Sequence, residues 1–569
     1  MKQLRLFIYI LIIGFLFGCE SETIPSASTN LVGKISTRGS NDIPSLPTNS
    51  QALFHTSSGT KIFTFDGNNW NGDQSIFSYS STTPNMLTAL YPAYNGERAI
   101  TENPYTDYEL EDVLIAQSPY TNEQNIELTF RHLFSTLTVH ILSPLKETVT
   151  RISLDTPKIE TLNVDGSFSL SGTHQILPEL NTEGSYAFII PPKDNCTLTL
   201  HLTIGEETTS HPITHSFKSG YKYECNVKEP GIYNAEDLIE FSKVINMKKD
   251  GDLSRYGELQ EDGRMLYRLY ADIDFANVDS QELLPIGYYD GPSVIFSDIF
   301  DGQGHTISNL ILPDKSINKY VEESHSGLFG SIGINGIIKN LHIINAKTVV
   351  SPICNNVGGI AAKNKGTIKN CSVQNSSFTS SEGGYVGAIC GNMTEGYIIN
   401  CHSSYNNLIA PERGFAGGII GGSCGNIFNS YAYDNQFKGV EGSYAGGFIG
   451  SIYTIDNTYH LNIANSYVLH TKTYNYWGAF IGIIQSNNFS FDNTFYNGGK
   501  LVYNKDDKYS GIYQYKYSTF QTEINNKNKH VYEHLNNWIK ESDTTQYPYS
   551  ILKTWIKSDT APYPAIFAE

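Results

Sequence analysis

Short runs of alternating apolar and polar residues recur between residues 51 and 228, and this period predicts β-strands. The clearest run extends from Ile126 to Ile141. Pro191-Pro192 ends another run, because proline cannot donate to a ladder. Such strands without long helical patterns between them are typical of antiparallel β-sandwiches. The pattern therefore predicts two sandwich modules, at residues 51–144 and 145–228.

The pattern changes near residue 229. Apolar residues from Leu238 to Ile245 recur at helical spacing, and Asn234 with Asp237 forms the capping signal of a helix start. We expect this helix to cover a sheet end. Residues 229–325 then form the N-terminal cap and lead-in of a repetitive region.

A repeat of about 30 residues fills residues 326–500. Its first part is a glycine-rich apolar strand, aligned at Gly327, Gly359, Ala388, Gly418, Gly447 and Ala479 in steps of 32, 29, 30, 29 and 32 residues. One such unit cannot bury its own apolar face, whereas stacked units can. The fixed period predicts a β-solenoid.

A second strand in each unit contains an asparagine at a change in the in-out alternation. Apolar residues lie two positions before it, so the asparagine marks a bend between strands. Asparagines stacked at one corner could hydrogen-bond along the stack. The six positions are Asn340, Asn370, Asn400, Asn429, Asn465 and Asn493.

The segments outside these regions are predicted to have supporting roles. Residues 19–50 are rich in Ser, Thr, Asn and Pro and indicate a flexible tether. Residues 501–569 lose the repeat. Since a solenoid needs its last coil covered, and since Val531, Leu535 and Trp538 lie on one helical face, we expect a C-terminal cap here.

The N-terminus has the pattern of an export signal. A basic start precedes the apolar run from Leu6 to Phe17, which is too short to span a bilayer as a mature helix. Gly18-Cys19 resembles a bacterial lipobox, which implies a lipoprotein signal peptide at residues 1–18 and lipidation of Cys19. An ordinary signal peptide with a chance cysteine is the alternative. The acidic residues after Cys19 resemble the surface-export signal of some Gram-negative lipoproteins, which implies anchoring in the outer membrane facing the exterior.

Composition and charge narrow the function classes. The formal net charge of −18 over 569 residues argues against nucleic acid and other polyanions as partners. Low charge with abundant Tyr and Gly is typical of β-rich extracellular proteins. Seven cysteines remain besides Cys19, and their spacing matches no zinc pattern. We expect no metal and no cofactor.

Ordered landmarks in residues 30–228 resemble fimbrillin-like subunits. They are Ala89-Leu90-Tyr91-Pro92-Ala93-Tyr94, Asp112-Val113-Leu114-Ile115-Ala116, Leu128-Thr129-Phe130-Arg131-His132-Leu133, Leu137-Thr138-Val139, Tyr186-Ala187-Phe188-Ile189-Ile190-Pro191-Pro192 and Gly220-Tyr221-Lys222-Tyr223. The resemblance implies transthyretin-like β-sandwiches and assembly with other fimbrial subunits by strand exchange. In some relatives an N-terminal segment is removed after a basic residue, and Arg38 occupies a suitable place. An exposed tether residue without such a role is the alternative.

The repeats of residues 229–500 look like the GLUG motif, which implies a parallel β-helix-like scaffold found on surface proteins. The expected fold class is thus all-β. Transthyretin-like β-sandwich modules precede a right-handed parallel β-helix-like solenoid with helical caps.

Catalytic motifs are absent from the sequence. It contains no His-Glu-x-x-His, Gly-x-Ser-x-Gly or phosphate-binding glycine loop. Asp272 with Asp274, or Asp298 with Asp301, could form the carboxylate pair of a β-helix polysaccharide lyase or hydrolase, but structural roles in turns are preferred. Cys371 and Cys401 occupy matching repeat positions, as a disulfide or as buried thiols. We therefore predict no catalytic residues.

Aromatic residues cluster in the fifth and sixth units and are candidates for ligand contact. Tyrosine and tryptophan give large rigid contact area at small entropy cost. The alternative is that they cover the solenoid edge. The residues are Tyr453, Tyr459, Tyr474, Tyr476 and Trp477.

The order tether, assembly modules and elongated display domain favours a surface lipoprotein acting in cell adhesion. It would serve as an accessory or tip fimbrial subunit whose solenoid binds a host or bacterial surface glycan or protein. A non-fimbrial surface lipoprotein that binds glycan or protein is the alternative, and a glycan-active β-helix enzyme is a third.

Overall fold

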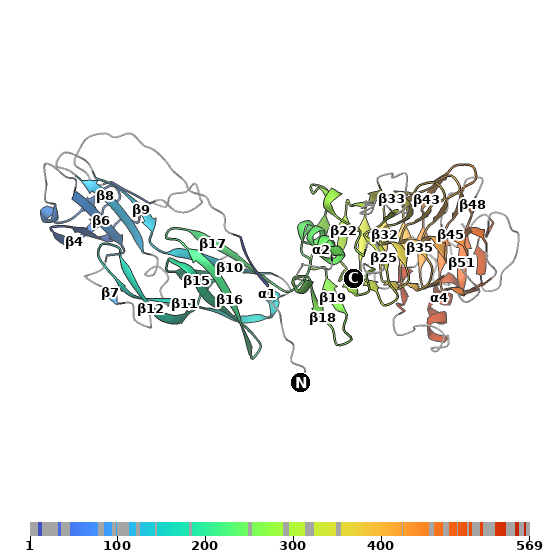
Figure 1. Ribbon diagram of the computed structural model, residues 1–569, viewed down its shortest axis with the longest axis horizontal. Coiled ribbons are helices and arrows are strands. Elements are labelled where there is room, and N and C mark those ends of the chain that lie inside the picture. The colour runs from blue at the N-terminus through green and yellow to red at the C-terminus, as the bar shows by residue number, and fades with distance from the viewer. Residues whose placement is uncertain are drawn as a thin grey trace. The chain divides into compact units, whose positions relative to one another are not determined.

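The structure is a computed structural model. It describes residues 9–13, 32–35, 46–77, 85–93, 98–99, 113–120, 126–142, 145–180, 185–247, 253–287, 295–312, 324–348, 354–423, 425–453, 460–469, 477–485, 488–497, 500–502, 512–515, 530–541, 552–556 and 563–564. The chain forms two compact units, Met1–Glu229 and Pro230–Glu569 (Figure 1), divided where the hydrophobic pattern changes.

The first unit begins with a seven-stranded sheet in the order β2-β9-β8-β6-β3-β4-β5. Its strands are β2 (Val32–Ile35), β9 (Glu127–His132), β8 (Leu114–Tyr120), β6 (Asn85–Tyr91), β3 (Gln51–Thr56), β4 (Gly59–Phe65) and β5 (Trp70–Asn71), and η1 (Gln74–Ile76) comes after β5 in the chain. β9 and β5 lie near opposite ends of the order, yet the rings of Phe130 and Trp70 are 5.8 Å apart between centroids. The sheet therefore curls so that its two ends share one core.

Two sheets packed face to face form the rest of the first unit. One has the order β1-β17-β10-β14-β13 and the other β12-β11-β15-β16, with β7 beside β11. Leu137 and Phe188 of the first sheet and Leu154 and Leu200 of the second lie in one buried core. The elements are β1 (Tyr9–Ile13), β17 (Lys222–Lys228), β10 (Ser135–Ile141), β14 (Ser185–Ile190), β13 (Glu179–Leu180), β12 (Phe168–Ile176), β11 (Val149–Leu162), β15 (Lys193–Ile204), β16 (Glu207–Phe217), β7 (Arg98–Ala99) and α1 (Leu145–Thr148).

Strand β10 corrects the division between the two sandwich modules. The sequence boundary at residues 144 and 145 puts β10 in the first module. In the structure β10 pairs with β14 and β17, and its inward residues lie in the second core. Strands pair according to which core takes their apolar face, and alternation alone does not say which core that is. The second module therefore begins before residue 135.

Two strands from the N-terminal segment complete sheet edges of this unit. β1 lies within the predicted signal peptide and pairs antiparallel with β17, and β2 lies within the predicted tether and pairs parallel with β9. The tether prediction for residues 19–50 thus includes a short paired strand. Both strands occupy the outermost position of their sheets.

The second unit opens with α2 (Ala235–Met247), which covers the first coil. The side chain of Asn234 accepts from the Asp237 N–H at 2.7 Å, and Asp237 in turn accepts from the Tyr233 N–H at 3.1 Å. This reciprocal capping satisfies N–H groups at the helix start. Phe241 is fully buried and its ring lies 4.7 Å from that of Tyr267. The amphipathic pattern thus becomes an end cover.

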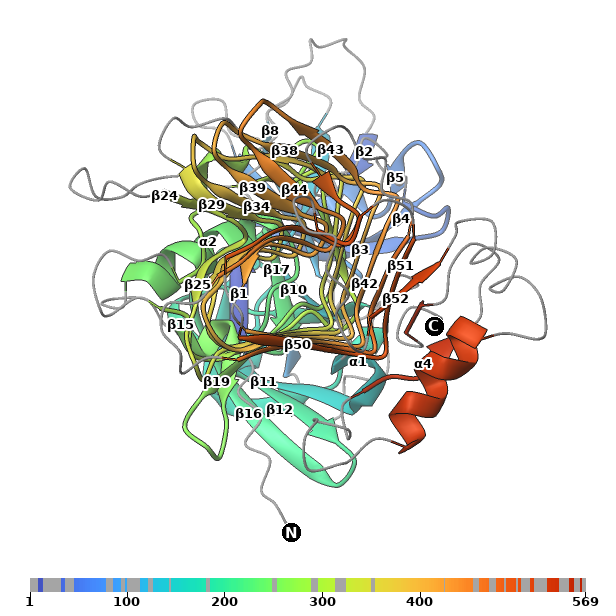
Figure 2. The same cartoon turned by 90° about the vertical axis from the view of Figure 1, so that its right-hand side faces the viewer.

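Five parallel sheets form the solenoid, and successive coils add one strand to each. In chain order within a coil they are called the β24, β25, β26, β27 and β28 sheets. Figure 2 shows the coils nearly superimposed in projection.

Three of these sheets have five or six strands each. The β24 sheet contains β24 (Ser324–Ser326), β29 (Cys354–Gly358), β34 (Tyr385–Gly387), β39 (Phe415–Gly417), β44 (Tyr444–Gly446) and β48 (Trp477–Gly478). The β25 sheet contains β25 (Phe329–Ile332), β30 (Ala361–Asn364), β35 (Cys390–Met393), β40 (Ile420–Ser423), β45 (Ile449–Ile452) and β49 (Ile481–Ile484). The short β28 sheet contains β23 (Ile311–Leu312), β28 (Lys347–Thr348), β33 (Ser377–Thr379), β38 (Asn407–Ala410) and β43 (Gln436–Gly439).

The two longest sheets extend from the lead-in to the last coil. The β26 sheet contains β18 (Gly257–Leu259), β19 (Met265–Arg268), β21 (Ile299–Asp301), β26 (Ile337–Lys339), β31 (Thr367–Lys369), β36 (Tyr397–Ile399), β41 (Asn426–Phe428), β46 (Leu461–Ala464) and β50 (Phe489–Asp492), and η3 (Leu253–Arg255) precedes it. The β27 sheet contains β20 (Ile273–Asp274), β22 (Thr306–Ser308), β27 (His342–Ile344), β32 (Ser372–Gln374), β37 (His402–Ser404), β42 (Tyr431–Tyr433), β47 (Tyr467–Leu469), β51 (Thr494–Asn497) and β52 (Ile512–Tyr515), and η4 (Ser280–Glu282) comes after β20 in the chain.

The register of the sheets shifts one assignment made from the sequence. Ser326 pairs with Val357, so the first step is 31 residues and Gly327 corresponds to Gly358, not Gly359. The ladder between β24 and β29 contains an irregularity, which the repeat pattern does not reveal. Inside the coils, one stack of buried residues from the β26 sheet fills the core: Ile338, Ile368, Ile398, Ile427 and Ile463.

The C-terminal segment packs along the side of the coils. α4 (His530–Glu541) contributes Leu535 to a buried cluster with Tyr431 and Tyr467 on the outer face of the β27 sheet. Trp555 of β53 (Trp555–Ile556), which pairs with β54 (Tyr563–Pro564), lies 5.4 Å from the ring of Tyr467. Figure 2 shows α4 outside the coil outline. Cover of the last coil by residues 501–569 stays a prediction.

The all-β prediction with a solenoid is confirmed. None of the helices among the described residues has the length and apolar character needed to cross a membrane.

Candidate functional site

Most of the predicted ligand-contact and processing residues fall outside the described part of the chain. These are Cys19, Arg38, Tyr459, Tyr474 and Tyr476. Trp477 lies in β48, where the backbone pairs with Ala445. Their roles stay predictions.

Tyr453 is the candidate aromatic residue whose side chain the structure describes. Its hydroxyl donates to the Asn392 side chain. Its ring lies 5.8 Å from that of Tyr385, and an added methyl at Gly422 would meet both rings. Tyr453 thus folds back over the outer face of the β25 sheet instead of standing free. Tyr385 itself begins a stack with Phe415 and Tyr444 on the neighbouring sheet.

The six repeat asparagines form a continuous hydrogen-bonded ladder. Each donates its Nδ2 to the Oδ1 of the asparagine one coil earlier, at distances from 2.7 to 2.9 Å. All six have φ between 44° and 56°, in the left-handed region where asparagine is tolerated better than most residues. The ladder therefore fixes the corner between the β26 and β27 sheets and satisfies buried amides.

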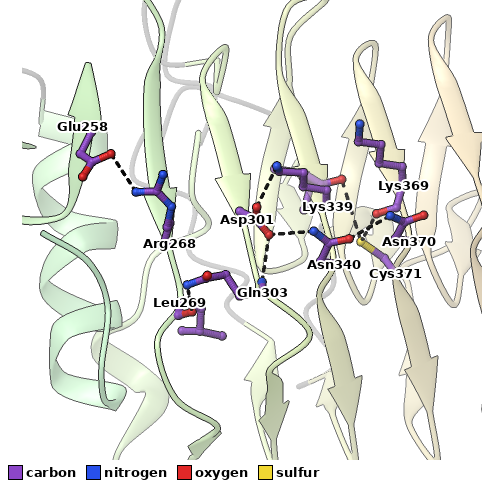
Figure 3. Close-up of polar contacts among 11 residues, drawn as sticks. Glu258, Arg268, Leu269, Asp301, Gln303, Lys339, Asn340, Lys369, Asn370 and Cys371 are labelled. Carbon is purple, nitrogen blue, oxygen red and sulfur yellow. Dashed lines mark hydrogen bonds and ion pairs between the residues drawn. The ribbon is translucent and has the colours of Figure 1, made fainter. Parts of the chain in front are cut away.

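Asp301 terminates this ladder on the lead-in side (Figure 3). It accepts from Asn340 Nδ2 at 2.9 Å, from the Gln303 N–H at 2.9 Å and from Lys339 Nζ at 2.8 Å. Burial would raise the pKa of Asp301, but the hydrogen bonds from Lys339, Asn340 and Gln303 outweigh it and hold the pKa below its usual value. The carboxylate thus stays charged as the acceptor for the first asparagine.

The other candidate carboxylates also bond within turns of the lead-in. Asp272 accepts from the Thr306 N–H at 2.8 Å and lies 3.2 Å from His305 Nδ1. Asp274 accepts from Asn309 Nδ2 at 2.6 Å, which lowers its pKa. Asp298 accepts from the Met265 N–H at 3.0 Å. Each of these carboxylates holds adjacent strands or turns together.

The glycine positions chosen from the sequence lie beside a more regular set. Gly358, Gly387, Gly417, Gly446 and Gly478 succeed one another in register through five coils. A methyl group at Gly417 would meet the carbonyl oxygen of Ile420 and lie 2.6 Å from the Gly450 nitrogen. The next position contains alanine at Ala388 and Ala479. Close backbone approach therefore requires the first glycine of each pair.

A second polar ladder, missed from the sequence, lies at the corner between the β27 and β28 sheets. Asn406 accepts from the Ser376 N–H at 2.9 Å, and Asn435 accepts from the Asn406 N–H at 3.0 Å. All three side chains are nearly fully buried. Asn345 and Asn375 each lie five positions after a residue of the first ladder and have left-handed φ, and this spacing could have signalled the second bend.

Thiols and metal-binding side chains complete the inventory. The six cysteines in the described part of the chain are buried and carry free thiols: Cys196, Cys225, Cys354, Cys371, Cys390 and Cys401. Burial raises the pKa of the Cys371 thiol well above its usual value. Within the described ranges, His, Cys, Asp and Glu side chains do not gather in threes that would hold a metal ion.

A hollow of about 290 Å³ lies on the outside of the corner between the β25 and β26 sheets. Gly366, Gly396 and Gly425 line it, together with Tyr397, whose exposed fraction is 41%. Beside the ring, Lys365 and Glu395 form an ion pair with a 3.1 Å distance between Nζ and Oε1. This is the described hollow in which an exposed aromatic ring and charged and polar side chains converge.

The two-module fold of the first unit leads to its relatives. Residues 43–246 match the family model for fimbrillin-like proteins. This fimbrillin-like region spans the curled sheet, the second sandwich and most of α2.

Solved structures and one curated protein are also similar to parts of the chain. A candidate cell adhesion protein from Bacteroides uniformis is 12% identical, with a TM-score of 0.28 over 35% of this chain and 91% of that chain. A fimbrial protein from Bacteroides ovatus is 12% identical, with a TM-score of 0.24 over 36% of this chain and 49% of that chain. Halomucin from Haloquadratum walsbyi is 26% identical over 234 residues, which is 39% of this chain and 2% of halomucin. The chain thus spans a very small share of halomucin.

Proposed function

We propose that this protein is a surface lipoprotein of the fimbrial type, at an accessory or tip position, whose solenoid displays a ligand-binding surface. The observation that carries the proposal is the fimbrillin-like region at residues 43–246, followed by a separate compact unit at Pro230–Glu569. A subunit that only builds a filament does not need a second unit of this size. GLUG-type repeats in that unit and lipidation at Cys19 belong to the same proposal.

The N-terminal strands support assembly by strand exchange. Removal of residues 1–18 during export would take β1 away from β17, and cleavage after Arg38 would take β2 away from β9. Each event would leave an edge strand with unpaired backbone groups, which is a template for a strand from another subunit. The two sheets concerned would then each accept one incoming strand.

Immunogold electron microscopy of intact cells tests the proposal. An antibody against residues 230–569 should place gold on filaments, and at their ends for a tip subunit. Cells that produce Cys19→Ala provide the control for anchoring, and they should release the protein or lose surface gold. Gold spread over the cell body without filaments would refute the fimbrial role and leave a surface-anchored binding protein.

A further inference from the structure

The hollow beside Tyr397 arises from a difference in turn length between coils. Two residues join β30 to β31, three join β35 to β36 and two join β40 to β41, whereas four join β25 to β26 and eight join β45 to β46. Short turns thus lie between longer ones. Ile334, with 71% of its surface exposed, and His460 stand at the two ends.

The floor of the hollow is backbone that cannot carry side chains. A methyl at Gly396 would meet the carbonyl oxygen of Gly366, and Gly396 has a φ of 88°. A methyl at Gly366 would meet the carbonyl oxygens of Gly333 and Gly336 in the preceding coil. Because the coils approach so closely here, the depression is fixed by the backbone and not by movable side chains.

The polar groups around the floor are held in place by their own contacts. Asn426 Oδ1 accepts from the Asn462 N–H at 3.1 Å, which orients the amide. The ring nitrogens of His460 lie 2.6 Å from Asn488 Oδ1 and 3.1 Å from Ser490 Oγ. A site whose groups are fixed before binding loses less entropy on binding.

The ring of Tyr397 is supported from behind. Its centroid lies 6.2 Å from that of Phe428, which belongs to a buried cluster with Trp538 of α4. The exposed part of the ring therefore presents a rigid apolar surface next to the Lys365–Glu395 pair. A ligand that suits this arrangement has an apolar face and a polar edge.

We propose that this hollow binds one uncharged sugar residue of a surface glycan, an inference that rests on the proposed adhesive function. A sugar ring offers C–H groups on its face and hydroxyl groups on its edge, which match the tyrosine ring and the flanking Thr367, Asn426 and ion pair. The volume lies at the lower end of the range for small-ligand sites. Lys365 and Glu395 cancel each other, and the chain's net charge of −18 disfavours anionic sugars at long range.

The test uses the full chain and an array of immobilised neutral and sialylated oligosaccharides, followed by calorimetric titration with the neutral oligosaccharide that gives the strongest signal. Tyr397→Ala should weaken binding at least tenfold, whereas Tyr397→Phe should retain most of it because the ring remains. Tyr405→Ala is the matched control. Tyr405 belongs to the same coil, is 49% exposed and does not line the hollow, so this variant should bind like the wild type.

Two outcomes would overturn the proposal. Wild-type binding to sialylated sugars or to peptides alone, or to none of the arrayed glycans, would exclude a neutral sugar as ligand. Neutral-sugar binding that Tyr397→Ala leaves intact would exclude this hollow. The adhesive function fails separately, through the immunogold result, since filament localisation does not depend on the hollow.

Discussion

Replacing Asn400 tests whether the asparagine ladder stabilises the solenoid. Asn400 is fully buried and lies in the middle of the ladder. Its Nδ2 donates to Asn370 at 2.9 Å, and its Oδ1 accepts from Asn429 at 2.7 Å and from the Lys553 N–H at 3.1 Å. The change Asn400→Gly removes these three bonds while glycine still accepts the φ of 52°.

The expected loss depends on the number of partners left behind. Each buried hydrogen bond contributes about 1 kcal/mol, and a partner that stays unsatisfied costs about 1 to 3 kcal/mol. Three bonds therefore give a loss of about 3 to 5 kcal/mol in the free energy of opening around Asn400. Asn400→Ala should cost about 1 kcal/mol more, because alanine is strained at left-handed φ.

Hydrogen exchange followed by mass spectrometry measures this loss locally. Exchange of peptides covering residues 397–410 should accelerate about a hundredfold or more in Asn400→Gly, since each 1.4 kcal/mol corresponds to a factor of ten. The control is Asn493→Gly at the ladder end, where the side chain donates only to Asn465 and to the His534 carbonyl. Exchange within tenfold of wild type for Asn400→Gly, or an equal effect in Asn493→Gly, would refute the reasoning.

Three further changes test other parts of the solenoid. Burial lowers the pKa of His402 from 6.5 to about 3, so the unfolded chain binds the extra proton and stability falls as pH drops through this window. His402→Phe should therefore lose about 2 to 3 kcal/mol less than wild type between pH 7 and pH 4.5 in urea unfolding, and parallel curves would contradict this. Trp555→Ala should cost about 3 kcal/mol and speed proteolysis of the C-terminal segment, because the ring is 1% exposed; unchanged cleavage rates would count against the packing. Gly417→Ala should unfold the central coils, because the methyl meets the Ile420 carbonyl, whereas Gly442→Ala, which points into open space, should shift the melting temperature only slightly; equal shifts would contradict the close-approach argument.

Features that depend on neighbouring residues were predictable from the sequence. The asparagine positions, the helix start at Asn234 and the alternating strands all arise from local conformational preference and spacing. The ladder was predictable as well, because identical residues at one corner of a repeat must stack. The register of Gly327 was one residue off, since an irregular ladder changes the count without changing composition.

Features that join distant segments were not predictable in the same way. Lys553 donates to Asn400 across 153 positions, and Tyr453 reaches Asn392 across 61. Strand β10 changes module because its apolar face fits the second core. The hollow beside Tyr397 depends on relative turn lengths, which gain meaning only when the coils are stacked.

The C-terminal segment changes how the solenoid should respond to perturbation. In a simple repeat array each coil contacts only its neighbours, so coils can open one at a time. Here the backbone of Lys553 bonds to both Asn400 and Asn429, and the Trp538 indole donates to Asp492 at 2.8 Å. One segment therefore bridges several coils, and opening any of them requires releasing that segment. The Tyr397 hollow lies on the same coils, so its rigidity depends on this brace.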